Sequence, residues 1–205
     1  LDYYLETLRV INIPIISKKT YVYTNDLFRS EVNIFFENNK LNNHKRIIGI
    51  HPGASIKEKI WNIENYIELI KLLLINKIPI LLFYGSNDFF LVETIKEKIN
   101  SDLLFIINTS KSIPLLIAYL EKCDFILCND SFVSHLAAAL NKNTITLISR
   151  NKLHCWKIYD LPNYIYIYGE PCNECKNGIC SGYECLKRIK VNSVFENIIK
   201  MLNVK

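Results

Sequence analysis

Short apolar runs alternate with longer amphipathic stretches over most of this chain of 205 residues. Each run is almost continuously apolar, which is typical of strands in a parallel sheet that is covered on both faces. We expect strands at residues 46–50, 79–84, 103–107, 124–128 and 144–148. The stretches between and after them have the period of amphipathic helices, and we expect helices at residues 63–75, 88–99, 112–121, 131–140 and 192–203. This alternation predicts an α/β fold with a doubly wound parallel sheet.

The beginning of the chain does not follow this alternation. Apolar positions within residues 4–10 have helical spacing, and Pro14 would end such a helix. A polar run over residues 37–45 is typical of a linker. We therefore predict two parts: residues 1–45, which are the end of one domain and a linker, and residues 46–205, which form a second domain.

The most informative stretch is the junction between the strand expected at 124–128 and the helix that follows it. Asp130 and Ser131 lie at this junction, and His135 lies one turn into the helix. The N-terminus of a helix offers unpaired backbone N–H groups and a partial positive charge, which favour a phosphate. Residues four apart share one helical face, so Ser131 and His135 point the same way. The alternatives are that Asp130 or Ser131 merely caps the helix and that His135 is a core histidine.

A second junction of the same kind lies upstream, where the strand expected at 46–50 runs into a Pro-Gly-Ala-Ser loop. Small residues allow a ligand to approach the backbone closely. Ser55 supplies a hydroxyl and Lys59 a positive charge, both of which suit a phosphate, although Lys59 alone could be a solvated surface lysine. Two such junctions together favour a ligand site, because ligands of open parallel sheets bind at the carboxyl ends of several strands.

Four motifs follow one another in a recognisable order. They are Ile-x-Ile-His-Pro-Gly-Ala-Ser at 48–55, Lys-x-Trp at 59–61, Tyr-Gly-Ser-Asn-Asp at 84–88 and Asn-Asp-Ser-x-x-x-His at 129–135. Together they resemble glycosyltransferase family 9, the heptosyltransferase family of lipopolysaccharide core assembly.

The resemblance implies an enzyme of the GT-B type, in which two Rossmann-like domains face each other. The first domain would bind the acceptor and carry the general base, and the second would bind the nucleotide-sugar. On this interpretation residues 1–45 are the end of the acceptor-side domain and the interdomain linker. Residues 46–205 are the Rossmann-like C-terminal domain that binds the nucleotide-sugar.

The resemblance also implies roles for single residues. Lys59 would stabilise the diphosphate leaving group, and the general base would lie outside this chain. Asp88 would meet the ribose, with a helix cap as the alternative. Phe132 departs from the family, which usually has glycine there, and this predicts either a more crowded sugar site or a different choice of donor. The residues expected to bind the nucleotide-sugar are Ser55, Lys59, Asp88, Asp130, Ser131 and His135.

The implied reaction is an inverting transfer of heptose or a similar sugar from a nucleotide-sugar, for which we expect ADP-heptose. The acceptor would be the lipopolysaccharide core or a related glycan, and catalysis would need no cofactor. Two other interpretations stay open at this point. The chain could be a non-catalytic nucleotide- or metal-binding fragment of a split or degenerate gene, or part of a nucleotide-sugar epimerase of similar shape.

A loop rich in cysteine forms a separate feature at residues 171–186. Several thiols close together in such a loop suit a structural zinc or iron, with free or oxidised thiols as the alternative. A comparable segment binds iron in the autotransporter heptosyltransferases that the resemblance includes. The candidate ligands are Cys172, Cys175, Cys180 and Cys185.

Composition narrows the remaining classes. Half of the residues are hydrophobic and 22% are charged, so a sizeable core can form. No apolar run approaches the roughly 20 residues that a membrane span needs. The net charge of +5 comes without an arginine-rich patch, so we expect no nucleic-acid partner. We expect a cytoplasmic protein with peripheral contact at the inner membrane. Because the chain begins with Leu1 and its single methionine is Met201, we expect it to be part of a longer protein.

Overall fold

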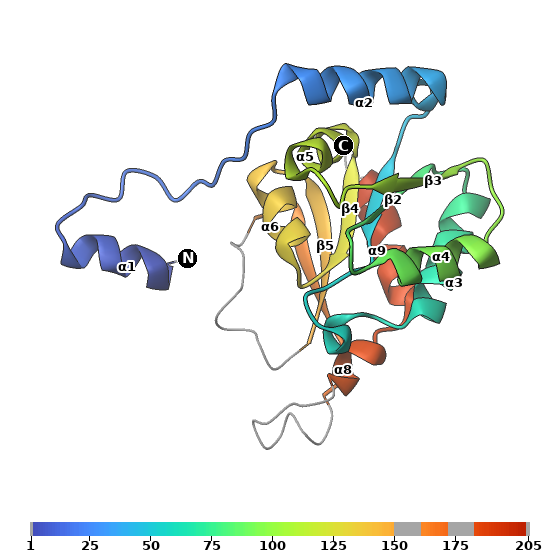
Figure 1. The fold of residues 1–205 in the computed structure, drawn as a ribbon. Coiled ribbons are helices and arrows are strands. Elements are labelled where there is room, and N and C mark those ends of the chain that lie inside the picture. The colour runs from blue at the N-terminus through green and yellow to red at the C-terminus, as the bar shows by residue number, and fades with distance from the viewer. Residues whose placement is uncertain (1, 150–160, 172–182, 204–205) are drawn as a thin grey trace.

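A computed structural model describes residues 2–149, 161–171 and 183–203 of this chain. Within these residues, six parallel strands form one sheet in the order β3-β2-β1-β4-β5-β6 (Figure 1). The strand order reverses between β1 and β4, which makes their shared end a topological switch point. The predicted doubly wound α/β fold is therefore confirmed. The strands are β1 (Ile48–His51), β2 (Ile80–Tyr84), β3 (Leu104–Asn108), β4 (Phe125–Asn129), β5 (Asn143–Ile148) and β6 (Tyr164–Tyr168).

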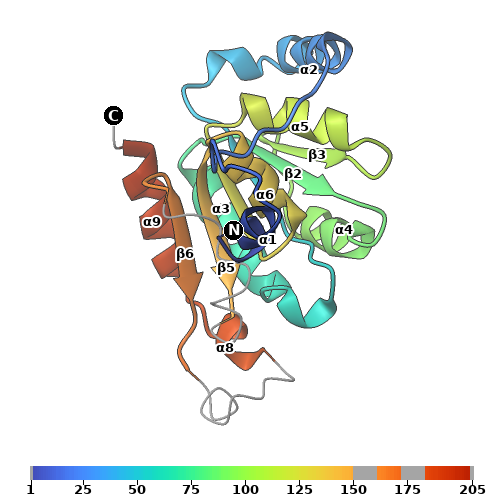
Figure 2. The ribbon, with the colours of Figure 1, turned by 90° about the vertical axis from the view of Figure 1, so that its left-hand side faces the viewer.

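Helices cover both faces of the sheet (Figures 1 and 2). Helices α3, α4 and α9 contribute to the buried cluster on one face, and α2, α5 and α6 contribute to the cluster on the other. Helix α1 stands apart from the sheet at the end of an extended segment (Figure 1). The helices are α1 (Asp2–Val10), α2 (Asp26–Asn38), α3 (Ile63–Ile75), α4 (Phe89–Lys98), α5 (Ile113–Lys122), α6 (Phe132–Ala139), α8 (Glu184–Lys187) and α9 (Val191–Asn203), with short 3-10 helices at Leu41–Asn43 and Lys57–Lys59.

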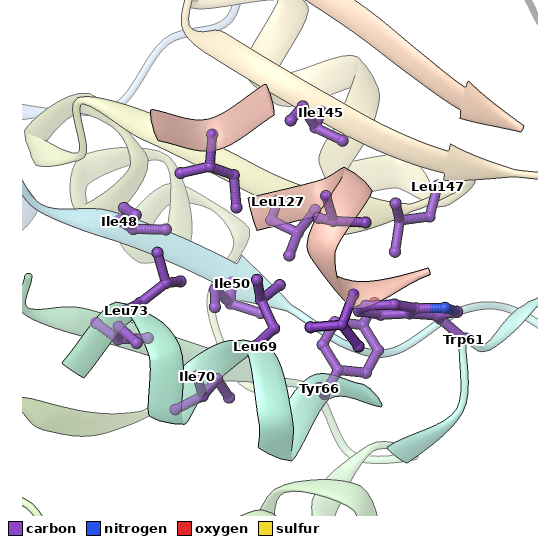
Figure 3. Close-up of a cluster of buried hydrophobic side chains, with 14 of the residues drawn as sticks. Ile48, Ile50, Trp61, Tyr66, Leu69, Ile70, Leu73, Leu127, Ile145 and Leu147 are labelled. Atoms are coloured by element: carbon purple, nitrogen blue, oxygen red, sulfur yellow. The ribbon is translucent and has the colours of Figure 1, made fainter. Parts of the chain in front are cut away.

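The two buried clusters follow from the alternation of side chains along the strands. Ile48 and Ile50 of β1 point into the cluster under α3 (Figure 3), whereas Leu81 and Phe83 of β2 belong to the opposite cluster. Trp61 is completely buried in the first cluster, as expected of a residue that packs the domain. Each large apolar side chain buried in this way contributes about 1.5–3 kcal/mol to folding. The strand ends that carry the polar motifs are thereby fixed on a rigid support.

All ten elements expected after residue 45 are present, with ends that differ from the expected ones by at most two residues. Three further elements, α2, β6 and the short helix α8, were not predicted. Asn25 caps α2 by accepting a hydrogen bond from the Phe28 backbone N–H, and Val32 and Phe36 are buried. Leu41 joins the same cluster, so part of the segment interpreted as a linker packs on the sheet. The division into two domains stays a prediction.

Among the described helices, none is long and apolar enough to cross a membrane.

Candidate functional site

A cavity of about 490 Å³ lies at the carboxyl ends of β1, β2 and β4. This is the edge of the sheet where open α/β folds bind their ligands. The structure brings all six residues of the predicted nucleotide-sugar site to this one cavity, and their binding role stays a prediction. The lining residues are His51, Ala54, Ser55, Lys59, Gly85, Ser86, Asn87, Asp88, Asp130, Ser131, Phe132 and His135.

Lys59 and Asp130 form an ion pair that joins the two junctions. The Nζ of Lys59 lies 2.6 Å from Oδ2 of Asp130, and the two side chains are only 15% and 14% exposed. Lys59 ends the 3-10 helix after β1, whereas Asp130 directly follows β4. Lys59 is thus a lysine of the cavity wall, and the interpretation as a solvated surface lysine is wrong.

Asp88 is held in place by its neighbours at the start of α4. It occupies the N-cap position, yet its side chain makes no capping bond to the helix. Its carboxylate instead accepts a hydrogen bond from the Gly85 backbone N–H at 3.2 Å and lies 3.5 Å from Nε2 of His51. A Cβ at Gly53 would lie 2.1 Å from the Asp88 Oδ1, so only glycine leaves room for this carboxylate.

His51 belongs to the cavity although we did not single it out from the sequence. It is the last residue of β1, and its side chain is only 4% exposed. Burial lowers the pKa of His51, and the neighbouring Asp88 carboxylate opposes that shift only in part. The signal that could have found it is a polar residue at the carboxyl end of an otherwise apolar strand.

Ser131 and His135 lie at the start of α6. Ser131 holds the N-cap position but its side chain makes no capping bond, and Oγ of Ser134 instead donates to the Ser131 carbonyl at 2.6 Å. His135 is exposed, so it is not a core histidine. Partial burial nevertheless lowers its pKa, with Asp130 opposing and Lys59 reinforcing the shift.

Asn129 is fully buried and forms hydrogen bonds that link the two junctions. Its Oδ1 accepts hydrogen bonds from the Trp61 backbone N–H at 3.3 Å and from the Tyr66 hydroxyl at 3.1 Å. Its Nδ2 donates to the carbonyls of Pro52 at 2.6 Å and Gly53 at 3.4 Å. Because one amide bonds the loop after β1 and the start of α3, it fixes where Lys59 meets the end of β4.

Phe132 gives this polar cavity an apolar wall. It is the first residue of α6, is 50% exposed, and lies edge-on to the His51 ring with centroids 6.0 Å apart. Ser55, which we predicted as a phosphate contact, is exposed on the lining of the same cavity.

Most of the predicted metal site lies outside the described residues. This applies to Cys172, Cys175 and Cys180, whereas Cys185 is buried in α8. The described part of the chain contains no cluster of three or more His, Cys, Asp or Glu side chains suited to a metal. A structural zinc or iron therefore stays a prediction, for which elemental analysis of the reductively purified protein is the measurement.

The doubly wound sheet and the cavity at its switch point define an α/β domain with a cavity at the carboxyl ends of its strands, the place where open parallel sheets bind ligands. The family model of glycosyltransferase family 9 (heptosyltransferase) matches residues 15–199, so this chain belongs to that family. No curated protein has a sequence that matches this chain.

Solved structures show the same fold at low sequence identity. A family 9 glycosyltransferase from Veillonella parvula has a TM-score of 0.85 at 18% identity and matches 98% of this chain. ADP-heptose LPS heptosyltransferase II of E. coli has a TM-score of 0.67 at 20% identity over 89% of the chain. The iron-containing, dodecameric heptosyltransferase TibC of enterotoxigenic E. coli has a TM-score of 0.52 at 16% identity over 77%. The matches span 59%, 53% and 45% of the lengths of these three proteins.

Proposed function

We propose that the cavity between β1, β2 and β4 binds the nucleotide-sugar donor of a family 9 glycosyltransferase. The observation that carries this proposal is the convergence of Lys59 with the start of α6 at the switch point of the sheet. An ammonium group and the amides of a helix N-terminus together suit a diphosphate. The Ser55 hydroxyl adds a further hydrogen-bond donor to the lining.

For the donor we propose ADP-heptose or a closely similar nucleotide-sugar, and for the acceptor lipopolysaccharide or a related glycan. The name of the E. coli heptosyltransferase II includes both ADP-heptose and LPS. TibC was crystallised in complex with ADP-D-beta-D-heptose. These names describe those two proteins, and family membership supports the extension to this chain. An acceptor of this kind would bring the protein to the cytoplasmic face of the inner membrane.

The proposed reaction is an inverting displacement. An acceptor hydroxyl attacks the anomeric carbon while the diphosphate leaves, and Lys59 stabilises the charge that develops on the leaving group. Both carboxylates of the cavity are already engaged, Asp130 with Lys59 and Asp88 with the Gly85 amide. Family membership supports a general base on an acceptor-binding domain, outside these residues.

Isothermal titration of the purified chain with ADP, UDP and GDP tests the binding proposal. We expect ADP to bind more tightly than UDP or GDP, and we expect no sugar transfer when ADP-heptose and an acceptor are added. Failure of all three nucleotides to bind would contradict the proposed donor site. Transfer by this chain alone would instead show that the base lies within it.

A further inference from the structure

The lining of the cavity carries little positive charge for the ligand proposed above. Among the described residues, its charged groups are one ammonium, that of Lys59, and two carboxylates, those of Asp88 and Asp130. Lys59 already contacts Asp130 at 2.6 Å. The start of α6 adds only about half an elementary charge, whereas the diphosphate of a nucleotide-sugar carries two negative charges. This lining therefore leaves much of the charge of the ligand uncompensated.

Two side chains of the lining can gain a positive charge by taking up a proton. They are the imidazoles of His51 and His135. Only 4% of the His51 side chain is exposed, and its ring contacts Asp88 and Phe132. His135 is exposed and lies one turn into α6, on the helical face that Ser131 shares. His135 is therefore the histidine that solvent and a ligand at the start of α6 can both reach.

The charge of His135 depends on groups that face it from other elements. Partial burial lowers its pKa, Asp130 after β4 opposes that shift, and Lys59 of the 3-10 helix after β1 reinforces it. His135 is therefore neutral at neutral pH in the empty site. Other titratable groups around α6 are Asp88 and His51 across the cavity, Cys128 of β4 and Tyr164 of β6, whose pKa values burial raises, and Lys18 and Lys19, which line a separate cavity at the far end of the helix.

A bound diphosphate changes the surroundings of His135 in one direction. Its negative charges lie in the same cavity and favour the charged imidazole. When a phosphate oxygen replaces Asp130 as the partner of Lys59, the freed carboxylate favours it further. Binding therefore raises the pKa of His135, and this requires only that the charges be close, not that any particular hydrogen bond form.

We propose that His135 takes up a proton when the nucleotide-sugar binds, and that the imidazolium is the second cation, beside Lys59, that holds the diphosphate. The inference rests on the proposed function of the cavity and deepens it, because it makes donor binding depend on pH. The proton comes from solvent, and the N–H of the ring is the one bond that forms. As the bond to the sugar breaks, the same cation stabilises the charge that develops on the leaving group.

Isothermal titration of the purified chain with ADP-heptose measures the proton directly. The diphosphate of ADP-heptose has no proton that titrates near neutral pH, so every proton taken up goes to the protein. Titrations at pH 6.5 in PIPES and in imidazole differ in heat by the protons exchanged with the buffer. We expect uptake that approaches one proton, and affinity that falls about tenfold from pH 6 to pH 8.5, as the pH rises through the pKa of His135 in the complex.

Two results of these titrations would overturn the proposal. One is binding without proton uptake at every pH between 6 and 8.5. The other is tighter binding on addition of Mg²⁺ with no uptake in its presence or absence, because a metal ion would then supply the missing charge.

Three substitutions locate the proton. His135→Gln should abolish the uptake and weaken binding about tenfold at pH 6 but little at pH 8.5, whereas a structural role would weaken it equally at both. His135→Lys carries a permanent charge, so it should bind more tightly than His135→Gln at pH 8.5, again without uptake. His44→Gln is the matched control, because His44 precedes β1 and does not line the cavity, and it should behave as wild type. Uptake that survives in His135→Gln would overturn the proposal.

Thermal unfolding shows whether the variants are folded. Should His135→Gln not fold, His135→Lys decides the matter, because proton uptake that persists there contradicts the assignment. A wild-type chain that binds neither ADP nor ADP-heptose would overturn the proposed function and this inference together. A wild-type chain that binds ADP-heptose without taking up a proton would overturn this inference alone.

Discussion

The cavity contains two pairs of a basic and an acidic side chain, and the pairs differ in burial and in freedom. Lys59 and Asp130 are in direct contact at 2.6 Å and are 15% and 14% exposed. His51 and Asp88 are 3.5 Å apart and are 4% and 12% exposed. The lysine has a flexible four-carbon stem, whereas the histidine ring is attached to the end of a buried strand.

This difference indicates a division of labour within one site. A ligand phosphate can replace Asp130 as the partner of Lys59, because only one long side chain has to turn. Asp88 has no such freedom, since its carboxylate fills the space above Gly53 and accepts from the Gly85 amide. We therefore interpret the Lys59–Asp130 pair as the part that responds to charge and the His51–Asp88 pair as a fixed frame.

The largest effect on activity is expected from breaking the Lys59–Asp130 pair. In the complete transferase, Lys59→Ala should lower kcat by roughly 10²-fold and raise KM by much less, because the ammonium group acts mainly on charge that develops in the transition state. Steady-state kinetics measure both constants. The matched control is Lys57→Ala, which removes an exposed lysine of the same 3-10 helix and should leave kcat unchanged. Unchanged turnover in Lys59→Ala would contradict a role for this pair in the reaction.

Asn129→Asp removes a hydrogen bond that links the two junctions. A carboxylate oxygen would replace the Nδ2 that donates to the Pro52 carbonyl at 2.6 Å, so two acceptors would face each other in a buried site. We expect the free energy of unfolding to fall by about 2 kcal/mol at pH 8 and by less at pH 5, where a protonated carboxyl can donate. Chemical denaturation at both pH values measures this. Asn76→Asp is the control, because its Nδ2 also donates to a carbonyl but is exposed, and an equal loss there would contradict the argument from burial.

Gly53→Ala tests whether Asp88 is held in a fixed position beside His51. The new Cβ would lie 2.1 Å from the Asp88 carboxylate and would force it away from its place beside His51. We expect a loss of about 1–3 kcal/mol in stability together with weaker ADP binding. At Gly85 the same Cβ would lie 3.4 Å from Asp88, an ordinary contact, so Gly85→Ala should be nearly neutral in thermal unfolding and titration. Similar behaviour of the two variants would show that Asp88 is not fixed as described.

The smallest expected effect is a dependence of the free energy of unfolding on pH that comes from His51 of the His51–Asp88 pair. Because burial lowers the folded-state pKa of His51 below its unfolded value near 6.5, folding favours the neutral ring. The stability that this provides is complete above pH 6.5 and is lost as the pH falls from there through the folded-state pKa. Thermal unfolding of wild type and His51→Asn between pH 8 and pH 5 measures it. The variant should lose less stability than wild type over this range, and parallel curves would contradict the assignment.

The sequence was sufficient for five of the six described strands and for the convergence of the predicted site residues, for a physical reason. Parallel strands buried on both faces are nearly continuous apolar runs, and their carboxyl ends meet at one edge, so polar residues after β1, β2 and β4 had to converge. Helix α2 was missed although Asn25 and the spacing of Phe28, Val32 and Phe36 are typical of a capped amphipathic helix. Strand β6 alternates tyrosine with isoleucine, which was also a usable signal.

The partners of individual side chains could not be predicted in this way. The Lys59–Asp130 and His51–Asp88 contacts join residues 71 and 37 positions apart, and their geometry depends on loop conformation. Asn129 reads as an ordinary turn residue until the Trp61 amide and the Pro52 carbonyl are seen on either side of it. The sequence patterns indicate which residues lie at the carboxyl edge of the sheet. Which of their side chains contact one another depends on tertiary packing.

On the proposed function, the ion pair of the cavity has a consequence for the speed of the catalytic cycle. With both histidines neutral, the lining presents one ammonium group against two carboxylates, so the empty site does not attract an anion strongly. Once the sugar has left, Asp130 can take back Lys59 and help to expel the nucleoside diphosphate. We therefore expect the spent nucleotide to dissociate quickly and to inhibit only weakly as a product, which would leave bond breaking, and not product release, to set the turnover rate.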